Sequence, residues 1–353
     1  MIYLDAVKVG NAIAYLRKKV GYTQRELADR IGVSDKAVSK WERGMGLPDT
    51  SIIGKIAVLL DTDTDSLLAG DLIHHNKDWT GLLILRRNPY GIKADTIIYD
   101  KPAINFLLSY FLLVGIKNIK LVCDRGDCEA VENLYGDGST LGLNLTYGDS
   151  IHDEDYQNSS SNVMLISGMT VIYGVDQSRF FQKAMLDKSK TTVLSLPKKK
   201  LDSPARIYYD SDKRMVTSEE GERLRTQYDY YQIPIIFCPA QVIADMQLNE
   251  TIGYDSIPYT RINDEVYTVT LDRGFVEIPL NDWDDVMDAS SFVKIVQKAC
   301  GMQIYCIEEI AWRRGMISHE EFIKLGEQMG QTPYGRYILE IAGAKVNGES
   351  IGN

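Results

Sequence analysis

The chain has 353 residues, of which 44% are hydrophobic and 25% are charged. This length suggests two or three domains, and the composition is that of an ordinary soluble globular protein. The longest apolar run, residues 103–115, is too short to span a bilayer and contains Asn105 and Ser109. It therefore predicts a buried helix, and we expect no membrane partner.

The formal net charge of −10 argues by itself against a nucleic-acid-binding protein, but the charges are unevenly distributed. Residues 1–60 contain 10 Lys and Arg against 6 Asp and Glu, whereas the remaining residues contain 29 against 43. A mildly basic head on an acidic body fits nucleic-acid binding through the head alone.

The five cysteines are scattered, and no pair has the Cys-x₂-Cys spacing of a zinc site. They are Cys123, Cys128, Cys238, Cys300 and Cys306. We expect reduced, mostly packed thiols in a cytoplasmic protein. The neighbouring His74 and His75 point apart in an extended chain, so we expect no bound metal and no cofactor. No charged segment followed by an apolar core opens the chain, so we expect no signal peptide.

The first predicted helix covers residues 7–20. Its buried face is apolar, with Val9, Ile13 and Leu16. Its outer face is basic, with Arg17, Lys18 and Lys19. These three cations are expected either near DNA phosphates or on a solvated surface.

Residues 22–43 are predicted to form two short helices joined by a tight turn. Thr23 and Glu26 have the spacing of a capping box, Gly32 permits the left-handed end of the helix, and Ser34 can cap the next one. The apolar positions follow the helical period and are expected to be buried: Leu27, Ala28, Ile31, Val38 and Trp41. The second helix then exposes a small, partly basic face of the kind that a major groove admits.

This segment resembles the helix-turn-helix of the λ-repressor/Cro-like (XRE-type) regulators, which bind double-stranded DNA. The matching residues are Thr23, Gln24, Leu27, Ala28, Ile31, Gly32, Val33, Ser34, Val38, Ser39, Trp41, Glu42 and Gly44. The resemblance implies that Gln24 touches a phosphate and that bases and backbone are contacted from the second helix. The implied DNA-binding residues are Thr23, Gln24, Ser34, Lys36, Ala37, Ser39, Lys40 and Arg43. The alternative is a helical hairpin that binds a protein.

Two further helices, at residues 48–60 and 65–69, complete an all-α five-helix head over residues 1–70. A short linker, residues 71–80, lacks the Gly/Ser run of a flexible tether. From residue 81 to 353 strands and helices alternate, which predicts a mixed α/β domain. We expect strands at 82–85, 118–123, 163–167 and 191–196. We expect two antiparallel strand pairs, 205–209 with 214–217 and 259–263 with 265–271. Helices are expected at 103–115, 177–187, 284–299, 307–314, 319–329 and 334–344.

Residues 81–353 resemble the sugar-1-phosphate nucleotidylyltransferases, most closely glucose-1-phosphate thymidylyltransferase. Five segments carry the resemblance: Y-D-K-P at 99–102, G-D-G-S-x-x-G-L at 136–143, Y-G at 173–174, A-S-x-F at 289–292 and C-x-E-E-I-A-x-R-x-G at 306–315. The resemblance implies a Rossmann-like nucleotidyltransferase fold that ends in helices. It also implies assembly into a homodimer or tetramer through this domain.

The chain departs from this family where the chemistry takes place. The Gly-rich loop that cradles nucleotide phosphates is replaced by residues 84–93, which contain one Gly and Pro89, although Lys93 can stand for the family's phosphate-binding lysine. The two aspartates that hold Mg²⁺ are replaced by Met169 and Pro279. Asp282, Asp284 and Asp285 are better explained as a helix start. We therefore expect no catalytic residues, an inactive enzyme and no metal site.

A second pocket of the family, which binds the nucleotide-sugar end product, is better retained. Its matching residues are Tyr173, Gly174, Glu309, Ile310 and Arg313. Arg313 could pair with a diphosphate. The alternative is that these residues only build the fold.

The leading hypothesis is a cytoplasmic DNA-binding transcriptional regulator whose inactive domain oligomerises and senses a nucleotide sugar or sugar phosphate. One alternative is a bifunctional, active nucleotidylyltransferase; another is a regulator whose large domain is only a scaffold.

Overall fold

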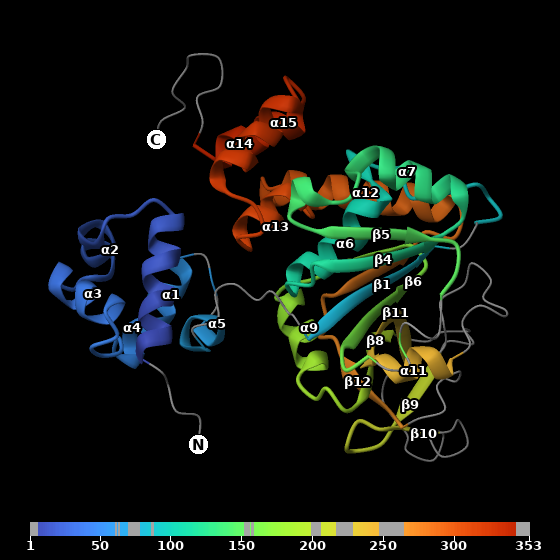
Figure 1. Ribbon diagram of the computed structural model, residues 1–353, viewed down its shortest axis with the longest axis horizontal. Coiled ribbons are helices and arrows are strands. Elements are labelled where there is room, and N and C mark those ends of the chain that lie inside the picture. The colour runs from blue at the N-terminus through green and yellow to red at the C-terminus, as the bar shows by residue number, and fades with distance from the viewer. Residues whose placement is uncertain are drawn as a thin grey trace. The chain divides into compact units, whose positions relative to one another are not determined.

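The computed structural model describes residues 6–60, 62, 64–69, 78–85, 88–151, 156, 159–198, 206–216, 229–246 and 265–343. Its contacts divide the chain into two units, residues 1–74 and 75–353 (Figure 1). Most of the predicted linker, with His74 and His75, lies outside the described residues. The first strand of the large unit begins at Trp79, two residues before the predicted start of that domain.

The small unit is all helical in the residues that are described. Its helices are α1 Ala6–Lys19, α2 Gln24–Ile31, α3 Asp35–Glu42, α4 Thr50–Leu59 and α5 Thr64–Ala69. The predicted five-helix head is confirmed, with boundaries shifted by one or two residues.

Local sequence explains the corner between α2 and α3. The Thr23 hydroxyl accepts from the Glu26 amide at 3.2 Å, while the Glu26 carboxylate accepts from the Thr23 amide at 2.7 Å. Gly32, with φ of 83°, ends α2, and the Ser34 hydroxyl caps α3. The predicted apolar face is buried, with Val38 and Leu27 fully inaccessible to solvent. These caps and this core fix the angle at which α3 is presented.

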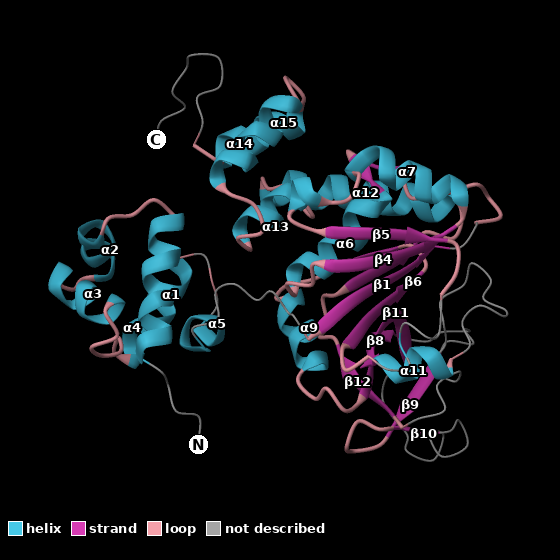
Figure 2. Cartoon of the chain, in the orientation of Figure 1, coloured by secondary structure: helices cyan, strands magenta, loops and turns pink. Residues whose placement is uncertain are grey.

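The large unit is built on a mixed sheet flanked by helices (Figure 2). Nine strands of the described residues form it, in the order β10-β9-β11-β6-β1-β4-β5, with β8 beside β11 and β12 beside β8. Their bounds are β1 Trp79–Leu85, β4 Asn118–Cys123, β5 Asn144–Gly148, β6 Asn162–Ser167, β8 Thr191–Lys198, β9 Arg206–Tyr209, β10 Met215–Val216, β11 Asp229–Pro239 and β12 Val266–Thr270. Strands β6, β1, β4 and β5 are parallel, and β11 runs antiparallel to β6. Two small ladders lie outside the sheet: β2 Ile97–Ile98 with β3 Lys101–Pro102, and β7 Thr170–Tyr173 with β13 Val276–Pro279.

The helices of the large unit cover both faces of this sheet. They are α6 Ala103–Leu113, α7 Arg125–Tyr135, α9 Gln177–Met185, α11 Ala240–Asp245, α12 Trp283–Cys300, α13 Ile307–Arg313, α14 His319–Gln328 and α15 Pro333–Ile341. Alternate β1 residues serve the two faces: Leu83 and Leu85 belong to the core under α6, α9 and α13, whereas Leu82 and Ile84 belong to the core under α11. The predicted mixed α/β class with C-terminal helices is confirmed.

Two details of the predicted sheet change. The pair of β9 with β10 is confirmed, but β12 pairs in parallel with β8, with Val266 opposite Thr191. Its predicted partner at residues 259–263 lies outside the described residues. No strand was predicted at β5, at the edge of the sheet, or at β11, which lies between β6 and β8. As predicted, α6 is a buried helix, every residue from Ala103 to Leu112 being buried.

No helix in the described parts of the chain is both long and apolar enough to cross a bilayer.

Candidate functional site

The outer face of α3 carries the cations predicted to meet DNA. Lys36, Lys40 and Arg43 are exposed, and Ser39 is half-buried. The Arg43 side chain folds back along the helix, where its Nε donates to the Ser39 carbonyl at 3.1 Å. Ala37 is partly buried against the core of the small unit.

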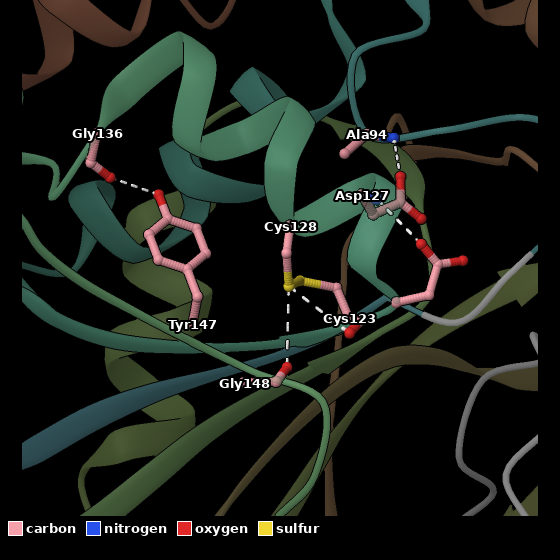
Figure 3. The surroundings of a disulfide bond; sticks show 8 residues. Ala94, Cys123, Asp127, Cys128, Gly136, Tyr147 and Gly148 are labelled. Carbon is pink, nitrogen blue, oxygen red and sulfur yellow. Dashed lines mark hydrogen bonds between the residues drawn. A yellow bond between two sulfur atoms is a disulfide. The ribbon is translucent and has the colours of Figure 1, made fainter.

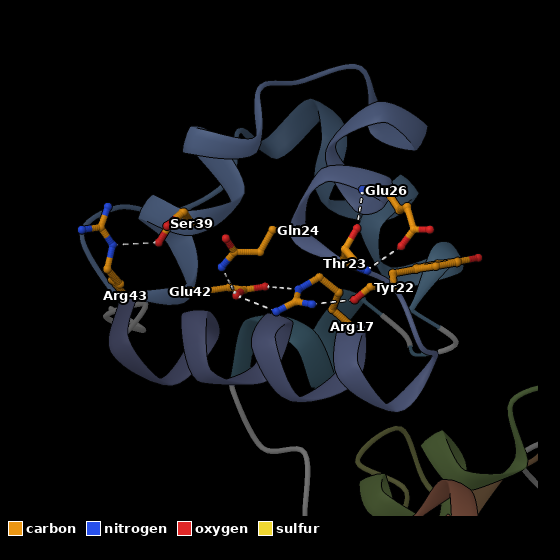
Figure 4. A network of polar contacts seen from close by, with 8 residues as sticks. All are labelled: Arg17, Tyr22, Thr23, Gln24, Glu26, Ser39, Glu42 and Arg43. Carbon is orange, nitrogen blue, oxygen red and sulfur yellow. Dashed lines mark hydrogen bonds and ion pairs between the residues drawn. The ribbon is translucent and has the colours of Figure 1, made fainter.

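Behind this face lies a buried ion pair that the sequence did not predict (Figure 4). The Arg17 guanidinium binds the Glu42 carboxylate through two nitrogens, with Nε–Oε1 at 2.5 Å and Nη2–Oε2 at 3.0 Å. Its third nitrogen, Nη1, donates to the Tyr22 carbonyl at 2.5 Å. The expectation that Arg17 faces outward is wrong, because only 7% of this residue is exposed. Arg17 thus connects α1 to the end of α3 and to Tyr22, two residues before the start of α2.

Gln24 belongs to the same network. Its Nε2 donates to Glu42 Oε2 at 2.7 Å, so Glu42 receives donors from both α1 and α2. The predicted phosphate contact of Gln24 stays a prediction. In the free protein the amide is held against Glu42. Glu42 therefore orders the residues around α3.

The residues predicted to bind an effector lie at two places in the large unit. Tyr173 ends β7, and its ring packs edge-on against Phe292 at 5.7 Å and against Tyr305 at 6.5 Å. At Gly174, a Cβ atom would fall 2.4 Å from the Phe275 ring, so only glycine fits. Burial raises the pKa of the Tyr173 hydroxyl.

The other group lies on α13. Glu309 accepts from Arg313 Nε at 2.7 Å and from the Tyr337 hydroxyl at 2.6 Å, while Ile310 packs against the core. The Arg313 side chain is 41% exposed, whereas that of Glu309 is 14% exposed. Burial raises the pKa of the Glu309 carboxyl, and the Tyr337 hydrogen bond opposes this shift. A solvent-accessible cation is therefore available here, already paired with a carboxylate.

Tyr305 is buried next to Tyr173, and the sequence did not predict a role for it at this site. Its hydroxyl bonds to the Ile172 carbonyl and the Gln177 side chain, and its ring packs against Phe106 and Tyr110. The residue is 8% exposed. The Tyr305 ring, held in place by these contacts, packs against Tyr173 and so positions it.

The loops after β1, β6 and β13 meet at one place. The Leu280 amide donates to the Met169 carbonyl at 3.0 Å, and Pro279 lies opposite Thr170 in the β7–β13 ladder. Asn88 follows β1, and its side-chain Nδ2 donates to the Asn281 carbonyl at 2.8 Å. Positions 169 and 279, far apart in the sequence, are therefore brought together.

The chain is similar to known proteins of two kinds. Residues 13–67 match the family model described as helix-turn-helix. Outside the head, the chain is similar to glucose-1-phosphate thymidylyltransferase from Neisseria meningitidis, with 25% identity over 259 residues, which cover 69% of this chain and 90% of that protein. The enzyme of the same name from Mycolicibacterium smegmatis is 23% identical over 260 residues, with 69% and 89% covered.

The large unit is a glucose-1-phosphate thymidylyltransferase-like domain.

A solved structure of a putative glucose-1-phosphate thymidylyltransferase from Bacillus anthracis also matches. It has a TM-score of 0.48 and 12% identity, and covers 61% of this chain and 94% of that one.

The meeting point of the three loops in the thymidylyltransferase-like domain does not fit a magnesium ion. Carboxylate oxygens are the ligands that Mg²⁺ prefers, yet Met169 offers a thioether and Pro279 offers no polar side chain. Asp282 caps α12 by accepting from the Asp285 amide at 2.9 Å, and Asp285 accepts from the Asn281 amide at 3.0 Å. Among the described residues no group of three or more His, Cys, Asp or Glu side chains is arranged to hold a metal ion.

The domain contains a disulfide between Cys123, at the end of β4, and Cys128, in α7 (Figure 3). The expectation of five reduced thiols is wrong for this pair, because the turn from strand to helix brings their Cα atoms to 5.6 Å. Next to it, the Asp127 carboxylate accepts from the Ala94 amide at 2.7 Å. Cys238 and Cys306 are buried free thiols, whereas Cys300 is exposed.

Proposed function

We propose that this protein is a sequence-specific DNA-binding transcriptional regulator whose thymidylyltransferase-like domain is a pseudoenzyme that oligomerises and senses a nucleotide sugar or sugar phosphate. The proposal is supported by a helix-turn-helix with its cations exposed on α3 and by a nucleotidyltransferase-type domain. In that domain Met169 and Pro279, the residues expected at the metal positions, lie close together. We propose the cytoplasm as its location, because both DNA and nucleotide sugars are found there.

The DNA contacts are assigned to Thr23, Gln24, Ser34, Lys36, Ala37, Ser39, Lys40 and Arg43. The hydroxyls of Thr23 and Ser34 cap helices by accepting hydrogen bonds, so each keeps a proton that can be donated to a phosphate. Lys36 and Lys40 supply mobile charge on the outer face of α3. Such contacts supply affinity through release of counterions and make binding sensitive to salt.

Replacing both Lys36 and Lys40 with alanine is expected to weaken binding to an operator sequence obtained by in vitro selection with the wild-type protein. If both contact phosphates, the slope of log K against log salt should fall by about 2. Fluorescence anisotropy across a salt series measures this. Lys55→Ala, which removes an exposed cation from α4, is the matched control and should bind as wild type does. Unchanged affinity in the double variant would contradict the assignment of α3.

The effector is assigned to Tyr173, Gly174, Glu309, Ile310 and Arg313, with Arg313 as the partner of a diphosphate. A diphosphate that binds here would either share the Arg313 guanidinium with Glu309 or take the place of Glu309. The planar N–H donors of the guanidinium suit a carboxylate and a phosphate equally. Effector binding would change DNA binding only if the effector binds one arrangement of the two subunits more tightly than another. The difference between these two affinities limits the size of the effect.

Arg313→Ala is expected to lower the affinity for dTDP-glucose by about tenfold or more, because a charge-assisted hydrogen bond is worth about 1.5–3 kcal/mol. Calorimetric titration measures the dissociation constant. Arg336→Ala, an exposed arginine on α15, is the control. Wild-type affinity in Arg313→Ala would place the effector elsewhere, and DNA binding without effector should be unchanged in both variants.

The protein is expected to be at least a dimer, since useful specificity needs two heads a helical turn apart. We place the dimer interface in the thymidylyltransferase-like domain. Sedimentation of fragments 1–74 and 75–353 measures this, and the cut is placed before β1 so that the strand stays whole. A monomeric 75–353 fragment beside a dimeric 1–74 fragment would contradict this arrangement.

A further inference from the structure

The thymidylyltransferase-like domain contains a pocket that none of the assigned DNA or effector residues lines. It lies between the turn that joins β2 to β3, the end of α12 and the start of α15. Its volume is about 480 Å³, within the range of small-molecule sites. Its lining includes Tyr99, Asp100, Gln297, Gln303, Tyr334 and Tyr337.

Two of the lining tyrosines have their hydroxyls engaged with carboxylates. The Tyr334 hydroxyl donates to Glu308 at 2.7 Å, and the Tyr337 hydroxyl donates to Glu309 at 2.6 Å. What these residues offer to the pocket is therefore the carbon surface of their rings. Tyr99 adds a third ring from the β2–β3 turn, and its residue is 41% exposed.

The polar side of the pocket has an unused acceptor. Gln297 is 7% exposed, and its Nε2 donates to Asp100 Oδ2 at 2.9 Å and to Gln303 Oε1 at 2.8 Å. Because both of these contacts need a donor, the amide orientation is fixed. Its Oε1 atom is buried and has no hydrogen-bond partner among the described residues. An unsatisfied buried acceptor costs about 1–3 kcal/mol, and a ligand hydroxyl would relieve this cost once a small rotation of the side chain exposes Oε1 to the pocket.

The charges around the pocket disfavour a phosphate. The Asp100 carboxylate lies 2.5 Å from the buried ammonium of Lys101, so this anion is already compensated. At the start of α15 the Thr332 hydroxyl accepts from the Gly335 amide at 3.0 Å, and Pro333 has no N–H, so this helix start offers few donors to an anion. Lys298 is the one cation among the described lining residues.

We propose that this pocket binds a neutral sugar. The C–H face of the sugar ring packs on the tyrosine rings, and its hydroxyls bond to Gln297 and Asp100. Such a site differs in chemistry from the proposed nucleotide-sugar site, because it recognises hydroxyl groups and needs no diphosphate. It gives the protein a second input whose ligand does not contact Arg313.

Saturation-transfer NMR and calorimetry with the full chain test this, using D-glucose, D-galactose, D-mannose and L-rhamnose as probes. At least one is expected to bind, and more tightly than glucose 1-phosphate. Tyr99→Asn removes an exposed ring at a position with φ of 61°, which asparagine tolerates. Gln297→Met removes the amide at nearly constant length. Each should weaken binding by about tenfold.

Lys294→Ala, one turn earlier on α12 and outside the pocket lining, is the control and should bind as wild type does. Thermal unfolding checks that each variant is folded. If Gln297→Met unfolds, the exposed Tyr99→Asn decides. No binding by any of the four sugars at tens of millimolar, tighter binding of the phosphate, or wild-type binding by Tyr99→Asn would overturn the proposal. Because Arg313 is not involved, failure here leaves the nucleotide-sugar proposal to its own test.

Discussion

Glu42→Ala is expected to destabilise the helix-turn-helix unit by about 3–5 kcal/mol and to abolish DNA binding as a consequence. The Glu42 side chain is 7% exposed, and that of Arg17 is 9% exposed. Removing one partner of a buried ion pair leaves the other charge buried without compensation, which is the costly case. Gln24 would lose its acceptor at the same time. Differential scanning calorimetry of the full chain should show a lower transition for the head and an unchanged transition for the larger domain.

A double variant separates this electrostatic effect from a loss of packing. Replacing Arg17 and Glu42 together with methionine removes both charges at similar volume, and such exchanges are often neutral or stabilising. Most of the lost stability should therefore return. Arg125→Ala breaks an exposed pair with Glu129 and should leave stability nearly unchanged, because exposed ion pairs contribute little. A head as stable in Glu42→Ala as in wild type would contradict the structural role of this network.

The thymidylyltransferase-like domain is expected to release no pyrophosphate from dTTP and glucose 1-phosphate in the presence of Mg²⁺. Positions 169 and 279 are adjacent in space, as a metal site requires, but they carry Met and Pro. Without carboxylates to hold the metal ion, the charge on the transferring phosphate is not offset. The rate should lie about a millionfold or more below that of a working enzyme.

Chromatographic analysis of the nucleotides measures this, with the thymidylyltransferase of Neisseria meningitidis as the positive control. Release of pyrophosphate that requires Mg²⁺ and stops with a chelator would contradict the pseudoenzyme proposal. It would favour a bifunctional protein that both binds DNA and makes a nucleotide sugar.

The parts of the fold that depend on neighbouring residues were predictable from the sequence. The capping box at Thr23, the glycine stop at Gly32 and the strand at 118–123 are encoded by residues a few positions apart, and all three are confirmed. Strand β11 was missed because Pro234 interrupts its apolar run, and its register against β8 shifts between Gln232 and Ile236.

The errors at the candidate sites have the same physical origin. Arg17 looked like a surface cation because its partner, Glu42, is 25 residues away. The position of Tyr305 against Tyr173 depends on a turn that no local motif marks. The spacing of Cys123 and Cys128 matches no metal-binding motif, so it predicted no partner for either thiol. A strand followed at once by a helix start at Asp124 was the available signal.

Calorimetric titration of dTDP-glucose into the full chain tests most directly whether the thymidylyltransferase-like domain senses a nucleotide sugar without converting it. The titration is run once with a chelator and once with Mg²⁺ and pyrophosphate. We expect saturable binding to wild type in both, at least tenfold weaker binding to Arg313→Ala, and intact dTDP-glucose at the end. Absence of binding would contradict sensing, and formation of dTTP and glucose 1-phosphate would contradict the loss of catalysis.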